Sequence, residues 1–209
     1  MQSGILVGMG LPPGDRELVQ IVNAALADVS RRAGPWLVCR LGCTQCCHGA
    51  FAINELDALR IGAGMDTLRR EKPDLAAEIE RRARTWIGTH GVDFPGDLET
   101  GRLGDSDEDR ERFAEFANEA ACAALDPATG RCDVYEWRPM TCRVFGPPIQ
   151  MDGGNGGAKV LGHCELCFVG ATEDEVARCE MPVSDDLEEK LLDEIPEKGE
   201  TLVAFALLR

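Results

Sequence analysis

Aromatic residues and long apolar runs are both scarce in this sequence. Phe, Trp and Tyr make up 5% of its 209 residues, so the core has to be built mainly from Ala, Leu, Val and Ile. No stretch approaches the roughly 20 apolar residues that a membrane-spanning helix needs. The segment Met1–Gly14 also lacks the cationic start and long apolar middle of a signal peptide. We therefore expect a cytoplasmic protein with no membrane partner.

Runs of basic residues are missing as well. The chain carries 22 Lys and Arg against 37 Asp and Glu, a formal charge of −15 at pH 7. Binding to nucleic acid requires Lys and Arg gathered on one surface to neutralise phosphates. We therefore expect no nucleic-acid partner, and we interpret the runs of Asp and Glu as solvated helix faces. The length suits one compact domain.

Cysteine is the residue that this sequence has in quantity, with ten in all. Four of them lie in the segment Cys39-Arg-Leu-Gly-Cys43-Thr-Gln-Cys46-Cys47, which His48 follows. The others form two further groups along the chain: Cys122, Cys132 and Cys142, then Cys164, Cys167 and Cys179. Inert core cysteines scatter through a sequence. In a reducing compartment, clustered thiols indicate metal or redox chemistry rather than disulfides.

Zinc and iron–sulfur clusters both suit this pattern, because both bind four thiolates and accept C-x2-C spacing. Eight or nine plausible ligands imply two sites, or one site with spare thiols. Successive side chains point in different directions, so Cys46 and Cys47 would serve two neighbouring sites, or one would ligate while the other packs. The spacing of Cys39, Cys43 and Cys46 also matches radical S-adenosylmethionine enzymes. Gln45 replaces their usual aromatic residue, which counts against that class.

Arginines near the later cysteines could offset the charge of such a centre. Four thiolates around Zn²⁺ or a [4Fe–4S]²⁺ core leave a charge of roughly −2. Arg143 adjoins Cys142 in a segment otherwise poor in charge, so we expect it to bind the cofactor by donating to sulfur. Arg138 could equally form surface ion pairs. His48 and His163 adjoin cysteines and could replace a thiolate, although a hydrogen-bonding role is commoner.

Helical periodicity dominates the rest of the chain. An apolar stripe predicts a helix that opens at Asp15 and stops at Gly34-Pro35. Capping residues predict further helices that begin near Asn54, Pro73, Ser106, Thr172 and Ser184. We expect the Asn54 helix to be short and to end near Gly62 or Gly64.

Three other segments carry weaker signals. The stretches 88–104 and 126–157 are expected to be irregular, with Gly153–Gly157 as a hairpin loop. Cys122 would project opposite the apolar face of the Ser106 helix, so either that helix ends before it or this cysteine faces a site. The apolar tail Leu202–Leu208 should be buried, as a strand or as a helix.

The middle of the chain resembles the YkgJ-like cysteine-cluster family, which is described as a zinc- or iron-chelating domain with about eight cysteines. The motifs that carry the resemblance follow in order: Cys39-x3-Cys43-x2-Cys46-Cys47, Cys122-Ala-Ala-Leu125, Gly130-Arg-Cys132-x2-Tyr135, Arg138-Pro139 and Cys142-Arg143. Carried over by position, it implies as metal ligands Cys39, Cys43, Cys46, Cys47, Cys122, Cys132 and Cys142. An eighth would come from Cys164 or Cys167, and Cys179 lies outside the pattern.

These observations predict a mainly α protein, a single compact helical domain whose irregular cysteine-bearing loops gather around a metal centre. Residues 1–35 would form an N-terminal helix packed on the core, 36–170 the metal-binding part, and 171–209 a helical segment with the apolar tail. The expected cofactor is an iron–sulfur cluster, with 4Fe–4S favoured, for electron transfer or redox chemistry. A structural zinc domain that binds a partner is the alternative. A protein-modifying, methyl-transfer-like enzyme is another, since flagellin lysine methylases contain a similar domain.

Overall fold

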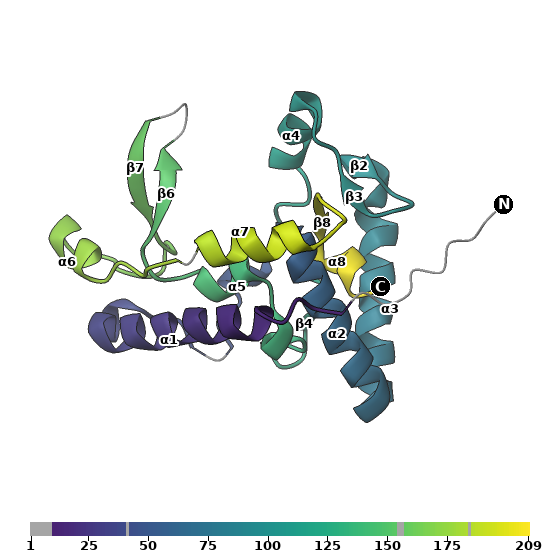
Figure 1. Ribbon diagram of the computed structural model, residues 1–209, viewed down its shortest axis with the longest axis horizontal. Helices are drawn as coiled ribbons and strands as arrows, with labels where there is room; N and C mark the ends of the chain where they lie inside the picture. The colour runs from purple at the N-terminus through teal and green to yellow at the C-terminus, as the bar shows by residue number, and fades with distance from the viewer. Residues whose placement is uncertain (1–9, 41, 154–156, 184) are drawn as a thin grey trace.

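The computed structural model describes residues 10–40, 42–153, 157–183 and 185–209. Its elements confirm the mainly α class. Two pairs of helices run in different directions (Figure 1). One pair is α1 (Asp15–Ala33) and α7 (Asp185–Glu194), and the other is α2 (Glu55–Glu71) and α3 (Pro73–His90). No helix in the described ranges is long and apolar enough to cross a bilayer.

The helices predicted from Asn54, Ser106 and Thr172 start after these capping residues, as predicted, whereas α1 follows Gly14 and has no side-chain cap. The first helix begins at Asp15 and is stopped by Gly34, whose φ of 51° lies in the left-handed region. The Asn54 side chain accepts a hydrogen bond from Asp57 N at 2.9 Å and caps α2. The expected end of this helix at Gly62 or Gly64 is wrong, because α2 continues to Glu71.

A small antiparallel sheet joins distant parts of the chain in the order β1–β8–β3–β2. Its strands are β1 (Ala52–Asn54), β2 (Gly96–Asp97), β3 (Arg102–Leu103) and β8 (Glu200–Leu202). Thr201 pairs with both Ile53 and Arg102. The expectation of an irregular stretch over 88–104 missed β2 and β3, which have two residues each. The apolar tail is buried as expected and is both strand and helix, since β8 leads into α8 (Val203–Ala206).

The remaining elements are short. They are α4 (Asp107–Ala114), β4 (Leu125–Asp126), β5 (Arg131–Cys132), α5 (Met140–Val144), β6 (Ile149–Gly153), β7 (Gly157–Gly162), α6 (Glu173–Arg178), and the 3₁₀ turns η1 (Gly34–Trp36), η2 (Gln45–Cys47), η3 (Gly91–Asp93) and η4 (Tyr135–Trp137). The predicted hairpin is confirmed by the pairing of β6 with β7, although residues 154–156 of its loop lie outside the described ranges. Ser184, the expected cap of α7, lies outside them too.

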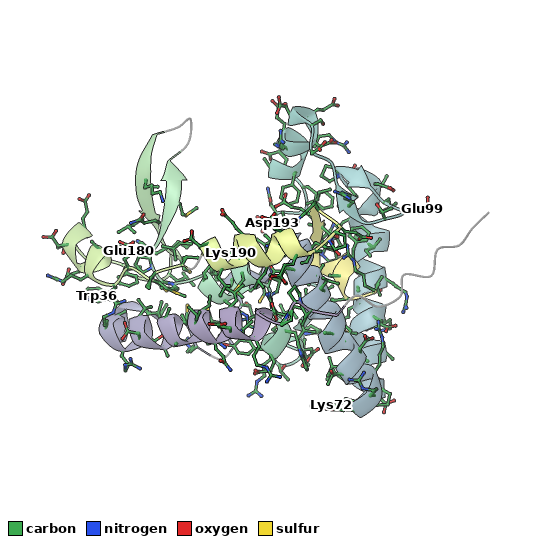
Figure 2. The ribbon with its side chains drawn as sticks, viewed as in Figure 1. Trp36, Lys72, Glu99, Glu180, Lys190 and Asp193 are labelled. Carbon is green, nitrogen blue, oxygen red and sulfur yellow. The ribbon has the colours of Figure 1, made fainter. Side chains whose placement is uncertain are left out.

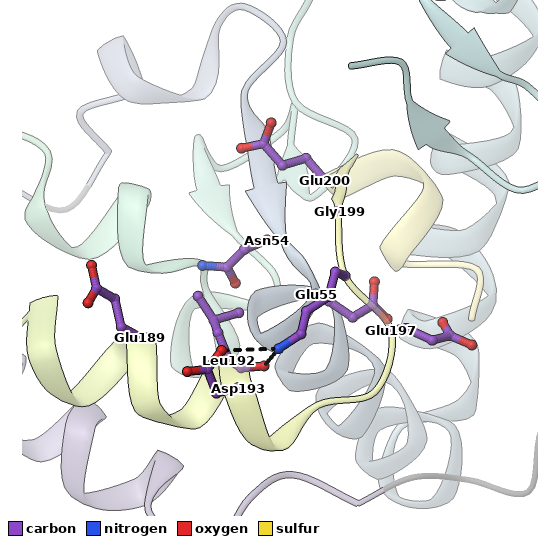
Figure 3. Close-up of a pocket in the computed structure, with 9 residues that line it drawn as sticks. Asn54, Glu55, Glu189, Leu192, Asp193, Glu197, Gly199 and Glu200 are labelled. Atoms are coloured by element: carbon purple, nitrogen blue, oxygen red, sulfur yellow. Dashed lines mark hydrogen bonds and ion pairs between the residues drawn. The ribbon is translucent and has the colours of Figure 1, made fainter. Parts of the chain in front are cut away.

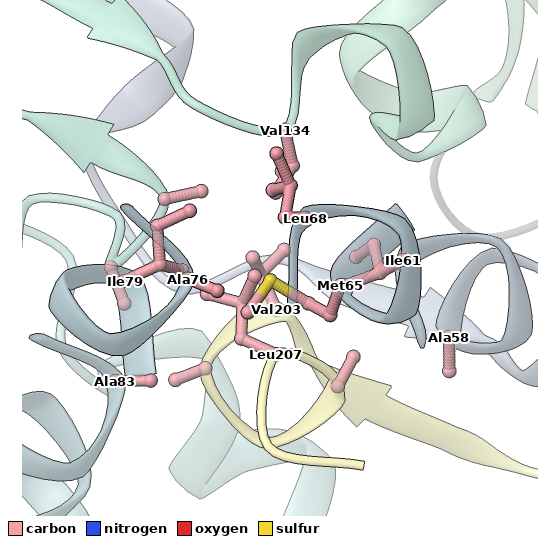
Figure 4. Close-up of a cluster of buried hydrophobic side chains, with 14 of the residues drawn as sticks. Ala58, Ile61, Met65, Leu68, Ala76, Ile79, Ala83, Val134, Val203 and Leu207 are labelled. Atoms are coloured by element: carbon pink, nitrogen blue, oxygen red, sulfur yellow. The ribbon is translucent and has the colours of Figure 1, made fainter. Parts of the chain in front are cut away.

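The largest hydrophobic core lies between α2, α3 and α8 (Figure 4). Ile61 and Met65 of α2, Ile79 and Ala83 of α3, and Leu207 beyond α8 have no exposed surface. A second core lies between α1 and α7, where their apolar stripes meet. The division of the chain at residues 35 and 170 stays a prediction.

A buried arginine links the two pairs of helices. Arg60 on α2 is 2% exposed and donates to Asp15 of α1 and to Asp57 of its own helix. Asp57 Oδ1 also accepts a hydrogen bond from Met140 N at 2.9 Å, at the start of α5. A charged group inside a protein is tolerated only when it is paired and hydrogen-bonded. This network therefore fixes α1 and α5 against α2.

We expect Arg60→Met to lower the free energy of unfolding by about 3–5 kcal/mol, because two carboxylates would be left buried without a cation. Arg70→Met, at an exposed position of the same helix, should change it by less than about 0.5 kcal/mol. Burial raises the pKa of Asp57. A carboxyl whose pKa is higher in the folded than in the unfolded state destabilises the protein at pH values above its unfolded pKa. The loss of unfolding free energy in Arg60→Met should therefore shrink as pH falls. Urea titrations at neutral and acidic pH test this, and equal losses for both variants would contradict it.

Two glycines two residues apart on α2 form a matched pair. A Cβ at Gly64 would lie 2.5 Å from the Trp137 ring, whereas one at Gly62 would meet nothing within 4 Å. Gly64→Ala should therefore destabilise the protein by about 1–3 kcal/mol through overpacking. Gly62→Ala should stabilise it by about 0.5–1 kcal/mol, because glycine is unfavourable inside a helix. Thermal unfolding of both variants measures the difference, and a shift of the same sign in both would refute the packing assignment.

Candidate metal centre

The structure sorts nine of the ten cysteines into two groups. The first group consists of Cys39, Cys43, Cys164 and Cys167, and the second of Cys46, Cys47, Cys122, Cys132 and Cys142. All ten are free thiols. The boundary divides the N-terminal motif between its second and third cysteines.

The first group is formed by two short loops. The Sγ atoms of Cys39 and Cys167 are 3.9 Å apart. Cys167 N donates to Cys164 O at 2.8 Å, which closes the tight turn of a C-x2-C pair. Cys43 N donates to Arg40 O at 2.9 Å and closes the turn of the other pair. Cys164 and Cys167 therefore lie in one turn, whereas Cys39 directly precedes the turn that ends at Cys43.

Hydrogen bonds hold these two loops against each other. Phe168 N donates to Trp36 O at 2.8 Å, and Gln45 Nε2 donates to Glu165 Oε1 at 2.7 Å. On the far side of Trp36, α1 is tied to the segment after α6 through Arg32, which donates to Glu180 O at 2.9 Å. Trp36 and Glu180 mark this end of the molecule in Figure 2. The first group therefore lies where the end of α1 meets the segment that follows β7.

The second group gathers thiols from four separate segments. Cys122 N donates to Cys47 O at 2.7 Å, next to a β-bridge between His48 and Ala121. Cys132 lies on β5, paired with Leu125 of β4. Cys142 lies on α5. The expected irregular chain over 126–157 is therefore interrupted by short elements, two of which, β5 and α5, carry thiols of this group.

An arginine from α3 fixes the two chain segments that carry Cys122 and Cys132. Arg82 Nε donates to Ala123 O at 3.1 Å, and its Nη2 donates to the Asp133 carboxylate at 2.5 Å. Ala123 directly follows Cys122 in the sequence, and Asp133 directly follows Cys132. Since α3 belongs to the main core, that core sets the separation of these two thiols. The helix predicted from Ser106 ends at Ala114, so Cys122 is not part of it.

Burial and mutual repulsion keep most of these thiols protonated. Burial, followed by the charges of Cys167, Cys164 and Cys43, raises the pKa of Cys39 to about 12. Burial, then the charge of Cys122, raises the pKa of Cys132 to about 12. The pKa values of Cys122, Cys142 and Cys164 are also raised, with burial as the first cause. Binding of a metal would replace these protons with a positive charge that relieves the repulsion.

Cys46 differs from the other thiols. A hydrogen bond from Cys47 lowers the pKa of Cys46 to about 6, and the charge of Arg138 lowers it further against the effect of burial. The same hydrogen bond raises the pKa of Cys47. The adjacent cysteines therefore face one another within the second group, with Cys46 as the thiolate and Cys47 as the donor.

The two arginines considered from the sequence are both buried beside the second group, at 8% exposure for Arg138 and 2% for Arg143. Arg143 donates to Arg138 O at 3.1 Å, to Asn23 Oδ1 at 3.0 Å and to Glu136 O. Burial and the charges of Arg138 and Arg60 lower its pKa to about 10. Contact between Arg143 and a cofactor stays a prediction, and Arg138 is the arginine whose charge acts on Cys46 and Cys132.

The other candidate residues lie at the edge of the groups. Cys179 is 6% exposed and packs in a small core with Ala33, Phe168 and two cysteines of the first group, Cys164 and Cys167. His163 Nδ1 is 3.0 Å from Cys164 O, and its ring lies near Phe168. His48 takes part in the β-bridge beside Cys122 through its backbone. These placements agree with a packing role for Cys179.

The donor set suits zinc or an iron–sulfur cluster, because each group offers at least four thiols. Among the described residues, no three His, Cys, Asp or Glu side chains converge closely enough to hold a metal ion as they stand. The protein therefore brings the thiols of each group together without closing them around a point. Closure would come from the metal itself, as in other sites where metal binding completes the fold.

Two features of the first group were missed from the sequence. A Cβ on Gly146 would lie 2.8 Å from Cys39 Sγ, and the φ of Gly146 is 124°, a conformation that favours glycine. Gly146 O also accepts a hydrogen bond from Cys164 N at 3.2 Å. The second feature is the Gln45–Glu165 hydrogen bond. The position of Gly146 in a cysteine-rich segment was a usable signal. The Gln45–Glu165 hydrogen bond joins residues 120 apart and had no local signal.

Comparison with known proteins gives one match. The model of the CxxCxxCC family, "Putative zinc- or iron-chelating domain", matches residues 38–151. This range contains all five cysteines of the second group and the first two of the first group. No curated protein matches the chain, and no solved structure does.

We expect Gly146→Ala to weaken metal binding at the first group, because the new methyl group would displace Cys39 Sγ. Gly170→Ala is the matched control, since Gly170 has a φ of 82° and nothing within 4 Å of its Cβ position. Both variants incur the same kind of backbone strain, about 1 kcal/mol or more. Competition with a chromophoric chelator should show a loss of affinity in the Gly146 variant alone. Equal affinity in both variants would contradict the placement of Cys39.

Proposed function

Because the chain belongs to the CxxCxxCC family, we propose that its two groups of cysteines are two separate metal centres. The observation that carries this proposal is the division of the N-terminal motif, which sends Cys39 and Cys43 to one group and Cys46 and Cys47 to the other. Ten free thiols agree with a reducing cytoplasm. Both Cys164 and Cys167 then belong to the first centre.

The second group is our candidate for an iron–sulfur cluster, with 4Fe–4S favoured. Its thiols come from four segments, and an inorganic core larger than one ion is suited to bridging so many segments. A cluster held by four thiolates supplies one-electron transfer. The role that follows is electron transfer or a related redox reaction.

Buried cations beside the second group support this assignment. Arg138 and Arg143 are buried next to it, and Arg60 lies close enough to lower the pKa of Arg143. A cluster with four thiolates would bring a charge of roughly −2 into this region. The arginines would stabilise that charge, and in the reduced cluster they would stabilise the added electron. Cys47, the fifth thiol, would remain as a hydrogen-bond donor to Cys46.

Zinc is the second candidate, and the first group favours it. Its cysteines form a C-x3-C pair and a C-x2-C pair, which are zinc-like spacings. Tetrahedral geometry with Zn–S bonds of about 2.3 Å places ligand sulfurs about 3.8 Å apart, and Cys39 Sγ is 3.9 Å from Cys167 Sγ. A closed site of four thiolates does no chemistry and stabilises the loops that carry it. The first centre would then be structural and the second redox-active.

Paired cysteine substitutions test the two centres separately. Anaerobic purification followed by metal analysis and an absorption spectrum should find iron and sulfide in the protein. Cys122→Ser with Cys142→Ser should remove the visible absorbance and the iron. Cys39→Ser with Cys164→Ser should remove the other metal and leave that absorbance in place. Cys179→Ala should retain both metals and be only mildly destabilised, because this residue packs in a core.

Several results would overturn parts of this proposal. Loss of all metal in both double variants would show one shared centre. A colourless protein with two zinc ions per chain would replace the redox role with a structural one. Loss of metal in Cys179→Ala would show that the ligand set extends beyond the nine thiols.

A further inference from the structure

A groove of about 1290 Å³ in the described part of the chain contains none of the cysteines. It lies between α2, the β2–β3 hairpin and the segment 197–200. Its floor is made of small and apolar side chains on one face of α2, at positions Leu59, Gly62 and Ala63, with Leu103 opposite. Because a Cβ on Gly62 would meet nothing within 4 Å, the floor is open to a bound molecule.

The walls of the groove carry excess negative charge, with seven carboxylates against four cations. The cations are already engaged: Arg209 pairs with Glu55, Arg102 donates to Lys198 O, and Arg112 donates to Asp93 O. In contrast, Glu99, Glu197 and Glu200 form no ion pair within the described ranges. The groove therefore offers free negative charge along an apolar floor.

A smaller pocket of about 430 Å³ adjoins the groove (Figure 3). The two cavities share Glu55, Glu197, Lys198, Gly199 and Glu200 in their linings. The smaller pocket adds Glu189 and Asp193, and its single cation, Lys198, is held by Leu192 O and by Asp193 at 3.5 Å. This pocket has the charge and the size to receive a Lys or Arg side chain.

We propose that the groove binds a basic amphipathic peptide segment of a partner protein. Its apolar side would lie over Gly62 and Ala63, and one cationic side chain would enter the acidic pocket beside Glu197 and Glu200. The volume exceeds the 300–1,000 Å³ of ordinary small-molecule sites. An apolar trough with charged walls is also the usual receptor of an amphipathic helix. The excess of carboxylates excludes an acidic partner.

The floor of the groove is tested by filling it. Gly62→Trp places a large side chain in the groove without entering the core, and Gly88→Trp makes the same change on α3, where a Cβ also meets nothing within 4 Å. The probe is a fluorescein-labelled helical peptide of Leu and Lys, measured by fluorescence anisotropy on the intact protein. We expect Gly62→Trp to weaken binding roughly tenfold or more, about 1.4 kcal/mol. Gly88→Trp should bind like the wild type.

The charge of the groove is tested with the same probe. Glu197→Lys should weaken binding several-fold, whereas Glu71→Lys, an exposed change at the end of α2, should not. The same peptide with Glu in place of Lys should not bind, and added salt should weaken the Lys peptide.

Three outcomes would overturn the proposal. They are failure of the Lys peptide to bind, equal binding by Gly62→Trp and Gly88→Trp, and equal binding of the Lys and Glu peptides. A concentration-dependent dimer that Gly62→Trp abolishes would show that a second copy of the chain fills the groove instead. Metal content should be unchanged in all these variants, so the outcome is independent of the two metal centres.

Discussion

The buried contact between Arg60 and two aspartates is the constraint on which the arrangement of the helices depends. Arg60 lies on α2 and reaches Asp15 at the first turn of α1. Asp57, its other partner, holds Met140 N at the start of α5. Cys142 follows two residues later, so its position is set from α2. One guanidinium thus relates the pair α1 and α7, the pair α2 and α3, and the second group of thiols.

The two groups of cysteines depend on different parts of this framework. The second group is held by regular elements. Arg82 of α3, a helix of the main core, fixes the segments that carry Cys122 and Cys132, and α5 carries Cys142. The first group depends on backbone contacts between loops, such as Phe168 N with Trp36 O, and on a glycine that leaves room for Cys39 Sγ. Loss of metal should therefore loosen the first group more than the second. A structural metal in the first group and a functional one in the second is consistent with this difference.

Local chemistry explains how much of the fold could be predicted from the sequence. Asn54, Ser106 and the Thr172–Glu175 capping box start helices where expected, because a cap acts within one turn. The end of α2 was mispredicted because Gly64 lies inside the helix, where it leaves room for the close approach of Trp137, a residue far away in sequence. The strands β2 and β3 have two residues each, too few to show a period of two.

The metal-site candidates illustrate the same limit. Thiol spacing alone gave eight or nine plausible ligands and left open one site or two, because adjacency in sequence does not fix which sulfurs share a centre. Cys46 and Cys47 were expected to serve different sites or different roles, and the structure places both in one group through a mutual hydrogen bond. The division falls instead before Gln45, whose side chain turns toward Glu165 of the other loop.

The distribution of charge in the folded chain separates the two proposed activities. Despite its net charge of −15, the protein buries Arg138 and Arg143 beside the second group of thiols. The groove beside α2 is lined instead by an excess of carboxylates, of which Glu99, Glu197 and Glu200 form no ion pair in the part of the chain that the structure describes. An anionic cofactor is stabilised by the first arrangement, and a cationic partner is attracted by the second. Because α2 carries both Arg60 and the floor of the groove, an occupied groove and a filled second centre would both act on this one helix.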